Sequence, residues 1–335
     1  MWTRTVGVFQ KRLAWATVLL LFITGLAYAE SPKEKLQGFL KLRAAEVVAG
    51  EPLVVTVGVK NVGDTPYVTT WAKSGIFRRY VRVQFTIITR ANLEIPGFQS
   101  LMDGRSLVRR NPDFINKLGG VTSTILPGEA VSAKQTVPLV QLVNGRWDGW
   151  LEPGIYTIQA KITIPSTSET FMAGPETFTV KPLAPENQGI LSIVTPELAS
   201  VLQGQGHSRE EDAAVAKAEE LRKKSPRAPH RQYLDFQVFR IVSKREEKVA
   251  KAKSYLEEFP KSPYVDDVLW ALANMEREAG EDQEAAAHLV TLLRDYPDSP
   301  LKQEAEELQK KLKDARERAA ERKAAQEKNP TPSQD

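Results

Sequence analysis

The residues best suited to chemistry in the first half of the chain are tryptophans around a tight-turn signal. Trp147-Asp148-Gly149-Trp150 places two indoles beside an Asp-Gly pair that favours a tight turn. Together with Trp71 these rings could form an aromatic platform for a sugar, because an indole face buries a large area at little entropic cost. The alternative interpretation is that both rings close one end of a hydrophobic core.

A second candidate surface is basic. Residues 71–117 carry nine basic and three acidic side chains, and part of this stretch is a long connection over 92–120. The basic residues are Lys73, Arg78, Arg79, Arg82, Arg90, Arg105, Arg109, Arg110 and Lys117. They could contact an anionic envelope glycan or polymer, lipid head groups or an acidic protein surface. The alternative is a solvated strand edge whose charges oppose aggregation.

Catalytic motifs are missing from the sequence. The histidines, His207, His230 and His288, lack metal-ligand spacing, and there is no cysteine, Gly-rich phosphate loop or G-x-S-x-G elbow. The adjacent acids of Asp266-Asp267 and Glu219-Glu220 point in different directions on a helix and make poor catalytic pairs. We therefore expect no enzyme activity, no metal site and no cofactor.

The N-terminus has the pattern of an export signal. Basic residues at 4, 11 and 12 precede a 14-residue apolar run over 13–26, and Ala27-Tyr28-Ala29 is an A-x-A cleavage site. An uncleaved anchor is the alternative, but 14 residues fall short of the ~20 needed to span a bilayer. We expect a signal peptide over 1–29, cleavage after Ala29, no transmembrane anchor afterwards, and a periplasmic or secreted mature chain.

Removal of this segment takes away three basic residues and lowers the formal charge from +4 to +1. A nearly neutral chain gives no reason to expect a nucleic-acid partner. Without cysteine, disulfides and lipid attachment through a thiol are excluded as well.

Residues 30–181 have a strand-like pattern. Short β-branched runs over 53–59, 81–88, 131–137, 154–164 and 176–180 are separated by turn residues, which predicts an antiparallel β-sandwich with the basic stretch as a long insertion. The segments VAGEPLVVTV (48–57), KNVGD (60–64) and LEPGIYT (151–157) resemble adhesion-related Ig-like domains of exported bacterial proteins. The resemblance implies a tyrosine-corner role for Tyr156, whose hydroxyl would tie down a neighbouring loop.

Residues 182–199 are predicted to be a linker that begins with a Pro-rich segment, and residues 200–328 are predicted to be helical. Within the helical part, Ser225-Pro226, Ser262-Pro263 and Ser299-Pro300 recur every 37 residues, a period typical of stacked helical units. An aromatic-proline stop precedes the last two pairs, at 259–260 and 296–297. The serine should cap the next helix, with proline in its first turn.

The junctions at 254–263 and 291–300 resemble those of tetratricopeptide repeats in bacterial envelope proteins. Leu272, Ala273, Ala285, Leu289 and Pro297 fall on that family's packing positions, whereas Leu269 and Glu276 depart from its tryptophan and tyrosine. The resemblance implies a helical repeat fold over about 225–312 that presents a concave protein-binding surface, with Tyr233, Trp270 and His288 as groove candidates.

The last predicted helix carries a narrow apolar stripe at Leu301, Ala305, Leu308, Leu312, Ala315 and Ala319. It could cap the repeats or form a short coiled coil, so the chain would be a monomer or a weak dimer. Residues 329–335 are predicted to be disordered.

These patterns together predict a non-enzymatic exported protein that binds or organises envelope proteins. The alternatives are carbohydrate or polymer binding by the sandwich, and an accessory subunit of an envelope enzyme.

Overall fold

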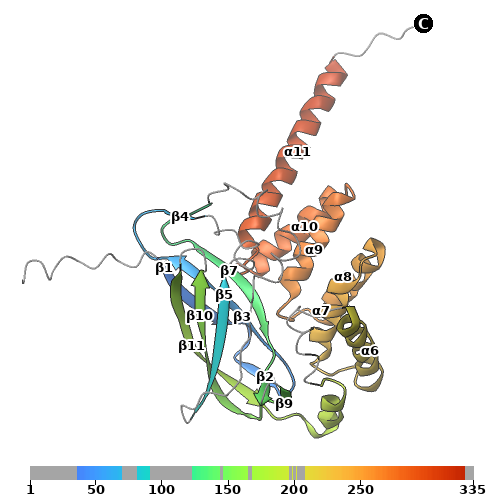
Figure 1. Ribbon diagram of the computed structural model, residues 1–335. Helices are drawn as coiled ribbons and strands as arrows, with labels where there is room; N and C mark the ends of the chain where they lie inside the picture. Colours follow the sequence, from blue (N-terminus) through green and yellow to red (C-terminus); the bar gives the residue numbers. More distant parts are fainter. Residues whose placement is uncertain are drawn as a thin grey trace, which may run out of the picture.

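The structure is a computed structural model that describes residues 36–69, 81–90, 123–143, 146–164, 168–195, 198, 201 and 208–328. It has sheets in the first half and helices in the second, so the chain is a mixed β and α protein. The helices stack beside the sheets, and the last helix extends away from them (Figure 1). The predicted signal peptide, the predicted disordered tail and most of the basic stretch lie outside the described residues.

Two main sheets form what we call the β half (36–181). One is antiparallel in the order β1 (Leu36–Leu42), β3 (Leu53–Asn61), β7 (Ala130–Val137). The other has the order β2 (Glu46–Val48), β11 (Glu169–Lys181), β10 (Gly154–Ile164), β5 (Arg82–Thr89), with only β2 parallel to its neighbour. Two short ribbons pair β4 (Tyr67–Thr69) with β6 (Ser123–Ile125) and β8 (Val140–Val143) with β9 (Arg146–Trp150).

The two main sheets share one hydrophobic core. Strand β5 shows the expected alternation, since Val83, Phe85 and Ile87 are fully buried while the residues between them are half-buried. The Tyr156 hydroxyl donates to the Glu152 carbonyl at 2.8 Å, which ties down the turn before β10 as predicted.

Strand β3 does not alternate. Every residue from Leu53 to Val59 is buried, because β3 is the central strand of a sheet that is covered on both faces. Val55 and Val57 face the core between the sheets, whereas Val54 belongs to the core of the helices. The second face of this sheet is therefore an interface and not a solvated surface.

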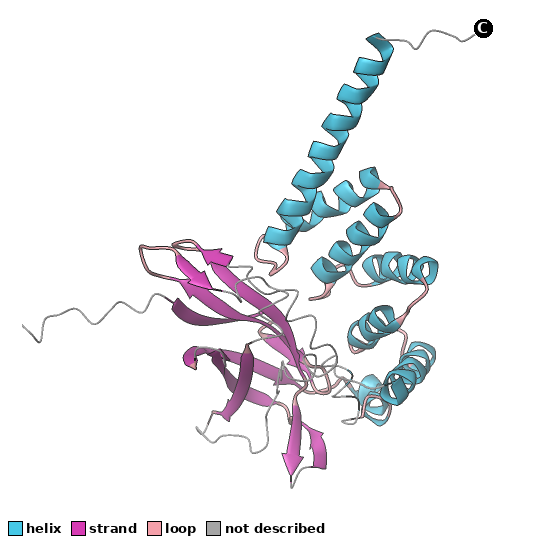
Figure 2. Ribbon diagram, turned by 45° about the horizontal axis from the view of Figure 1, so that its top comes forward, coloured by secondary structure: helices cyan, strands magenta, loops and turns pink. Residues whose placement is uncertain are grey.

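The helical half (185–328) contains a 3₁₀ segment, η1 (Pro185–Ser192), and six described α-helices. These are α6 (Ser208–Lys224), α7 (Arg231–Ile241), α8 (Arg245–Glu258), α9 (Val265–Glu278), α10 (Asp282–Asp295) and α11 (Lys302–Lys328). Successive helices follow one another in a row beside the sheets (Figure 2). None of the helices in the described part of the chain is long and apolar enough to cross a bilayer.

Two local predictions need correction. Residues 182–199 are not a free linker over their whole length, because Ile190, Ile193 and Val194 are buried in the same core as α6–α9. The Asp148-Gly149 pair is not a turn, because it lies within β9, where Gly149 pairs with Gln141 of β8 and Asp148 lies at an irregularity in the register. Pairing with the neighbouring strand overrides the turn signal at 148–149, and burial against helices overrides the linker signal at 190–194.

The first half of the predicted apolar stripe on α11 covers the last helical hairpin. Ala305, Leu308 and Leu312 are buried against α9 and α10, whereas Ala315 and Ala319 are exposed. Arg316 Nη2 donates to the Asp282 carbonyl at 2.8 Å. These contacts agree with a capping role for the start of α11.

Gly58 lies on the central strand β3, where it pairs with Phe39 of β1 and Ser132 of β7. An added Cβ would collide with the Val131 carbonyl oxygen and would meet the Phe39 ring at 2.8 Å. We expect Gly58→Ala to lower the free energy of unfolding by about 1–3 kcal/mol, measured by urea denaturation. Gly149→Ala is the matched control, because a Cβ there meets nothing within 4 Å. Equal stability of the two variants would contradict this packing.

Candidate functional site

The three Ser-Pro pairs lie at one edge of the helical half, in the turns that lead into α7, α9 and α11. We call them the first (225–230), second (262–267) and third (298–301) junctions. The carbonyl of each junction serine accepts a hydrogen bond from the N–H three residues later, at 3.0, 3.3 and 3.1 Å respectively. The donors are Ala228, Val265 and Lys302. Each serine therefore starts a turn, and the regular helix begins three to six residues after it, later than predicted.

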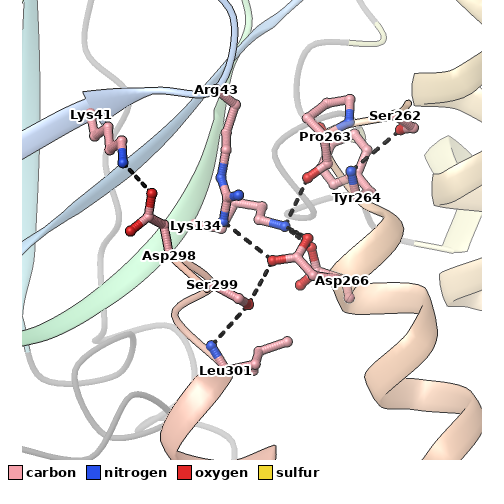
Figure 3. Close-up of polar contacts among 11 residues, drawn as sticks. Lys41, Arg43, Lys134, Ser262, Pro263, Tyr264, Asp266, Asp298, Ser299 and Leu301 are labelled. Carbon is pink, nitrogen blue, oxygen red and sulfur yellow. Dashed lines mark hydrogen bonds and ion pairs between the residues drawn. The ribbon is translucent and has the colours of Figure 1, made fainter. Parts of the chain in front are cut away.

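All three junctions contact the β half, and the second does so through a buried lysine of β7. Lys134 Nζ donates to the Pro263 carbonyl at 2.8 Å and ion-pairs with Asp266 and with Asp267, the latter at 2.6 Å (Figure 3). The side chains of Lys134 and Asp266 are only 4 % and 0 % exposed. A buried charge of this kind persists only when it is paired and hydrogen-bonded.

Asp266 also joins the second junction to the third. Its Oδ2 accepts hydrogen bonds from Ser299 Oγ at 2.6 Å and from Arg43 Nη2 at 3.2 Å, where Arg43 follows β1 (Figure 3). Burial raises the pKa of Asp266, but the charges of Lys134 and Arg43 and their hydrogen bonds outweigh this effect and hold the pKa below its usual value. The carboxylate is therefore ionised at neutral pH.

An aromatic contact supports the same junction. The hydroxyls of Thr136 on β7 and Tyr264 are 2.6 Å apart, and the Tyr264 ring stacks on Phe236 of α7 at a centroid distance of 4.0 Å. Ser262 Oγ accepts the Tyr264 N–H at 3.3 Å and lies 2.5 Å from the Tyr255 hydroxyl. The Tyr264 residue thus connects strand β7, the second junction and the α7–α8 hairpin.

The first junction reaches the β half through His230. Its Nε2 lies 2.9 Å from the Ala49 carbonyl, so the neutral ring donates from that nitrogen. Burial lowers the pKa of His230, and the hydrogen bond to Ala49 opposes this effect without cancelling it. Gly50, the residue that follows Ala49, has φ +88°, and a Cβ added there would meet both Leu191 and His230. The third junction adds an exposed ion pair, Lys41–Asp298.

Two open hollows lie on the helical half beside these contacts. A hollow of about 430 Å³, which we call the helix hollow, lies between α6, α7 and α8 and is lined by charged and aromatic side chains, among them Arg222, Glu247, Lys251 and Tyr255. A second, of about 550 Å³, lies between the first and second junctions and is called the junction hollow. Glu258 and Phe259 border both, so the two hollows adjoin.

The predicted binding residues that the structure describes do not form one site. Tyr233 is only 5 % exposed and packs edge-on against Tyr264 at 6.0 Å, so its prediction as a groove residue is wrong. Trp150 is half-buried and donates its indole N–H to the Val194 carbonyl at 2.9 Å, which commits it to the contact between β9 and the helical half. Trp147 lies in β9. Trp71, Arg78, Arg79, Arg109 and Arg110 lie outside the described residues.

The other two groove candidates have separate partners. Trp270 is half-buried against the core shared by α9, α10 and α11. His288 Nε2 lies 3.3 Å from a carboxylate oxygen of Glu276, which is 1 % exposed. In the part of the chain that the structure describes, no cluster of three or more His, Asp or Glu side chains is placed to hold a metal ion.

The residues that join the two halves, above all Lys134 and Asp266, were missed as functional candidates. Lys134 and Asp266 are 132 positions apart, and each resembles a surface charge on its own element. One signal is present in the sequence: Leu53–Val59 carries no charged residue on either face, which indicates a strand covered on both faces.

The buried and exposed ion pairs should differ sharply in energy. We expect Lys134→Met to lower the free energy of unfolding by about 3 kcal/mol, because Asp267, the Pro263 carbonyl and part of Asp266 lose a buried partner. Lys41→Met, which breaks the exposed pair at the same interface, should cost at most about 1 kcal/mol. Urea denaturation of both variants tests this, and similar losses would show that burial of Lys134 is unimportant.

The first junction should make stability depend on pH. The lowered pKa of His230 means that the unfolded chain binds a proton more readily than the folded chain. The contribution of His230 to the free energy of unfolding is therefore present above pH 6.5 and is lost as pH falls through the pKa of the folded state. We expect the thermal midpoint to fall below pH 6.5 and to fall less in His230→Gln, whose amide can still donate to Ala49. Parallel pH profiles for the two proteins would contradict this role.

Comparisons with known proteins leave the family open. No family model matches the chain, and no curated protein matches it. Weak structural similarity is found to a β-glucosidase from Erythrobacter marinus (17% identity, TM-score 0.23, 43% of this chain and 15% of that one). It is also found to the sporulation control protein Spo0M from Bacillus subtilis (15%, 0.22, 48% and 54%) and to E. coli alpha-2-macroglobulin (10%, 0.21, 78% and 22%). The matches span about 15–54% of those chains.

Proposed function

We propose that this protein is an exported, non-enzymatic binding or scaffold protein of the bacterial cell envelope. Its helices α6–α11 would form a short tetratricopeptide-like array that contacts envelope proteins. The β half would be an Ig-like sandwich that holds this array in place. Export rests on the N-terminal pattern of basic residues, apolar run and A-x-A site.

The observation that carries the proposal is the arrangement of the junctions and the hollows. The junctions form the edge of the array that is anchored to the β half, through His230, Asp266 and Asp298. The helix hollow and the junction hollow lie open beside that edge. A rigidly anchored array with open concave surface is suited to binding, because little freedom remains to be lost on association.

The helix hollow offers a direct test with a matched control. Glu247 and Lys251 line it, are partly exposed and form an i,i+4 pair at 3.9 Å. Lys313 and Glu317 form the same kind of pair at 3.9 Å on the exposed part of α11. Exchanging the two residues of either pair preserves the net charge and the helix spacing, but reverses the local field.

We expect the mature chain to retain specific proteins from its native envelope. The Glu247→Lys/Lys251→Glu variant should lose them, and the Lys313→Glu/Glu317→Lys variant should keep them. Quantitative affinity purification with the full mature chain measures this. If no protein is retained above the background of an unrelated chain, the binding function fails. If both variants bind like the wild type, the helix hollow is not the contact.

A further inference from the structure

The junction hollow is basic and its exposed cations have no carboxylate partner in the described part of the chain. It is lined by Arg227, Arg231 and Lys261 against a single acid, Glu258. Arg227 and Lys261 are exposed, whereas Arg231 is buried and is held by Asp235 at 3.0 Å and Glu258 at 2.5 Å. Arg227 and Lys261 are therefore the charges that are available to a ligand.

The lining of the same hollow also includes apolar residues beside Arg231. The Phe259 ring lies 5.2 Å from the Arg231 guanidinium, and Arg231 Nη1 donates to the Pro226 carbonyl at 2.7 Å. Prolines at 226, 229 and 260 and Ala228 add apolar lining, and Gln232 and Ser262 add polar lining. An apolar lining beside two exposed cations is suited to an extended chain that carries negative side chains.

The 37-residue period identifies an equivalent place one unit further along the chain. There the positions that correspond to Pro229 and Lys261 are Asp266 and Asp298. Both acids are contacted by basic residues of the β half, Asp266 by Arg43 and Asp298 by Lys41 (Figure 3). The space between the second and third junctions, which we call the second interval, is thus already contacted by a basic segment of the β half. This segment is the end of β1 and the residue that follows it.

The space between the first and second junctions, which we call the first interval, is basic. In the described part of the β half, no acidic segment contacts it in the corresponding way. The nearby acid of that half, Glu51, is buried, accepts the Val48 N–H at 2.7 Å and is hydrogen-bonded to Gln232. It is committed to these contacts and leaves Arg227 and Lys261 exposed. An occupant complementary to this interval must therefore be acidic.

We propose that the junction hollow binds an acidic, extended segment of a partner protein, with carboxylates on Arg227 and Lys261 and the chain lying over Phe259. The place corresponds to the one that the basic end of β1 contacts in the next interval, with the sign of charge reversed at Lys261, whose equivalent is Asp298. This inference rests on the proposed binding function and names the chemistry of one partner.

The probe is a fluorescein-labelled octapeptide of alternating glutamate and glycine, which places its carboxylates on one face when extended. Fluorescence anisotropy with the full mature chain should give saturable binding that weakens with salt. Arg227→Glu/Lys261→Glu should weaken it at least about tenfold. Lys310→Glu/Lys311→Glu is the control, with the same charge change on exposed positions of α11. Circular dichroism melting verifies that both variants fold.

The proposal is overturned if the wild type does not bind, which includes the case in which another segment of this chain fills the hollow. It is also overturned if both variants weaken binding equally, if a lysine-glycine octapeptide binds as well, or if dextran sulfate binds as tightly and is equally sensitive to Arg227 and Lys261. If the peptide fails but envelope proteins are still retained by the mature chain, only this inference fails. If neither binds, the proposed function fails too.

Discussion

Burial of the Lys134 ammonium group is the constraint on which the arrangement of the molecule depends. The sheet β1-β3-β7 has one face on its own core and the other on the helices, and the Lys134 side chain on that second face is only 4 % exposed. Asp266, Asp267 and the Pro263 carbonyl neutralise and satisfy it. Desolvation makes such pairs weak contributors to net stability but costly to misalign, so their main effect is to allow a single docking geometry.

A similar local structure recurs at each of the three junctions along the array. Each serine carbonyl accepts the same i+3 hydrogen bond, so the three junctions share one kind of turn. The first two reach the β half through residues after the serine, His230 and Asp266, and the third through Asp298, the residue before its serine. What differs is the chemistry of the contact: a neutral histidine at the first, a buried ion pair at the second, an exposed ion pair at the third. Asp266 connects two of them directly, through Ser299.

Sequence patterns predicted the elements well where the environment is local. The period of two in 81–88, the strand over 154–164 and the Ser-Pro spacing all correspond to elements of the structure. They failed where pairing or packing with another element decides. Gly149 is held in a strand by β8, Tyr233 is covered by Tyr264, and Ile190, Ile193 and Val194 are buried by helices that follow them. The partner of Lys134 could not be predicted, because a charge on a strand gives no information about a helix start 132 residues away.

The junction contacts also determine where this chain can tolerate a change of length. Helix α9 has 14 residues, so the turn at Gly280 that follows it lies about 20 Å along the helix axis from the second junction. Inserted residues there would extend a loop remote from the sheet. A single residue inserted between the second and third junctions within a helix would instead rotate all that follows by about 100° and separate Ser299 from Asp266. The contacts with the sheet thus constrain the lengths of α9 and α10, and homologous chains should vary in length at the far turn between these two helices.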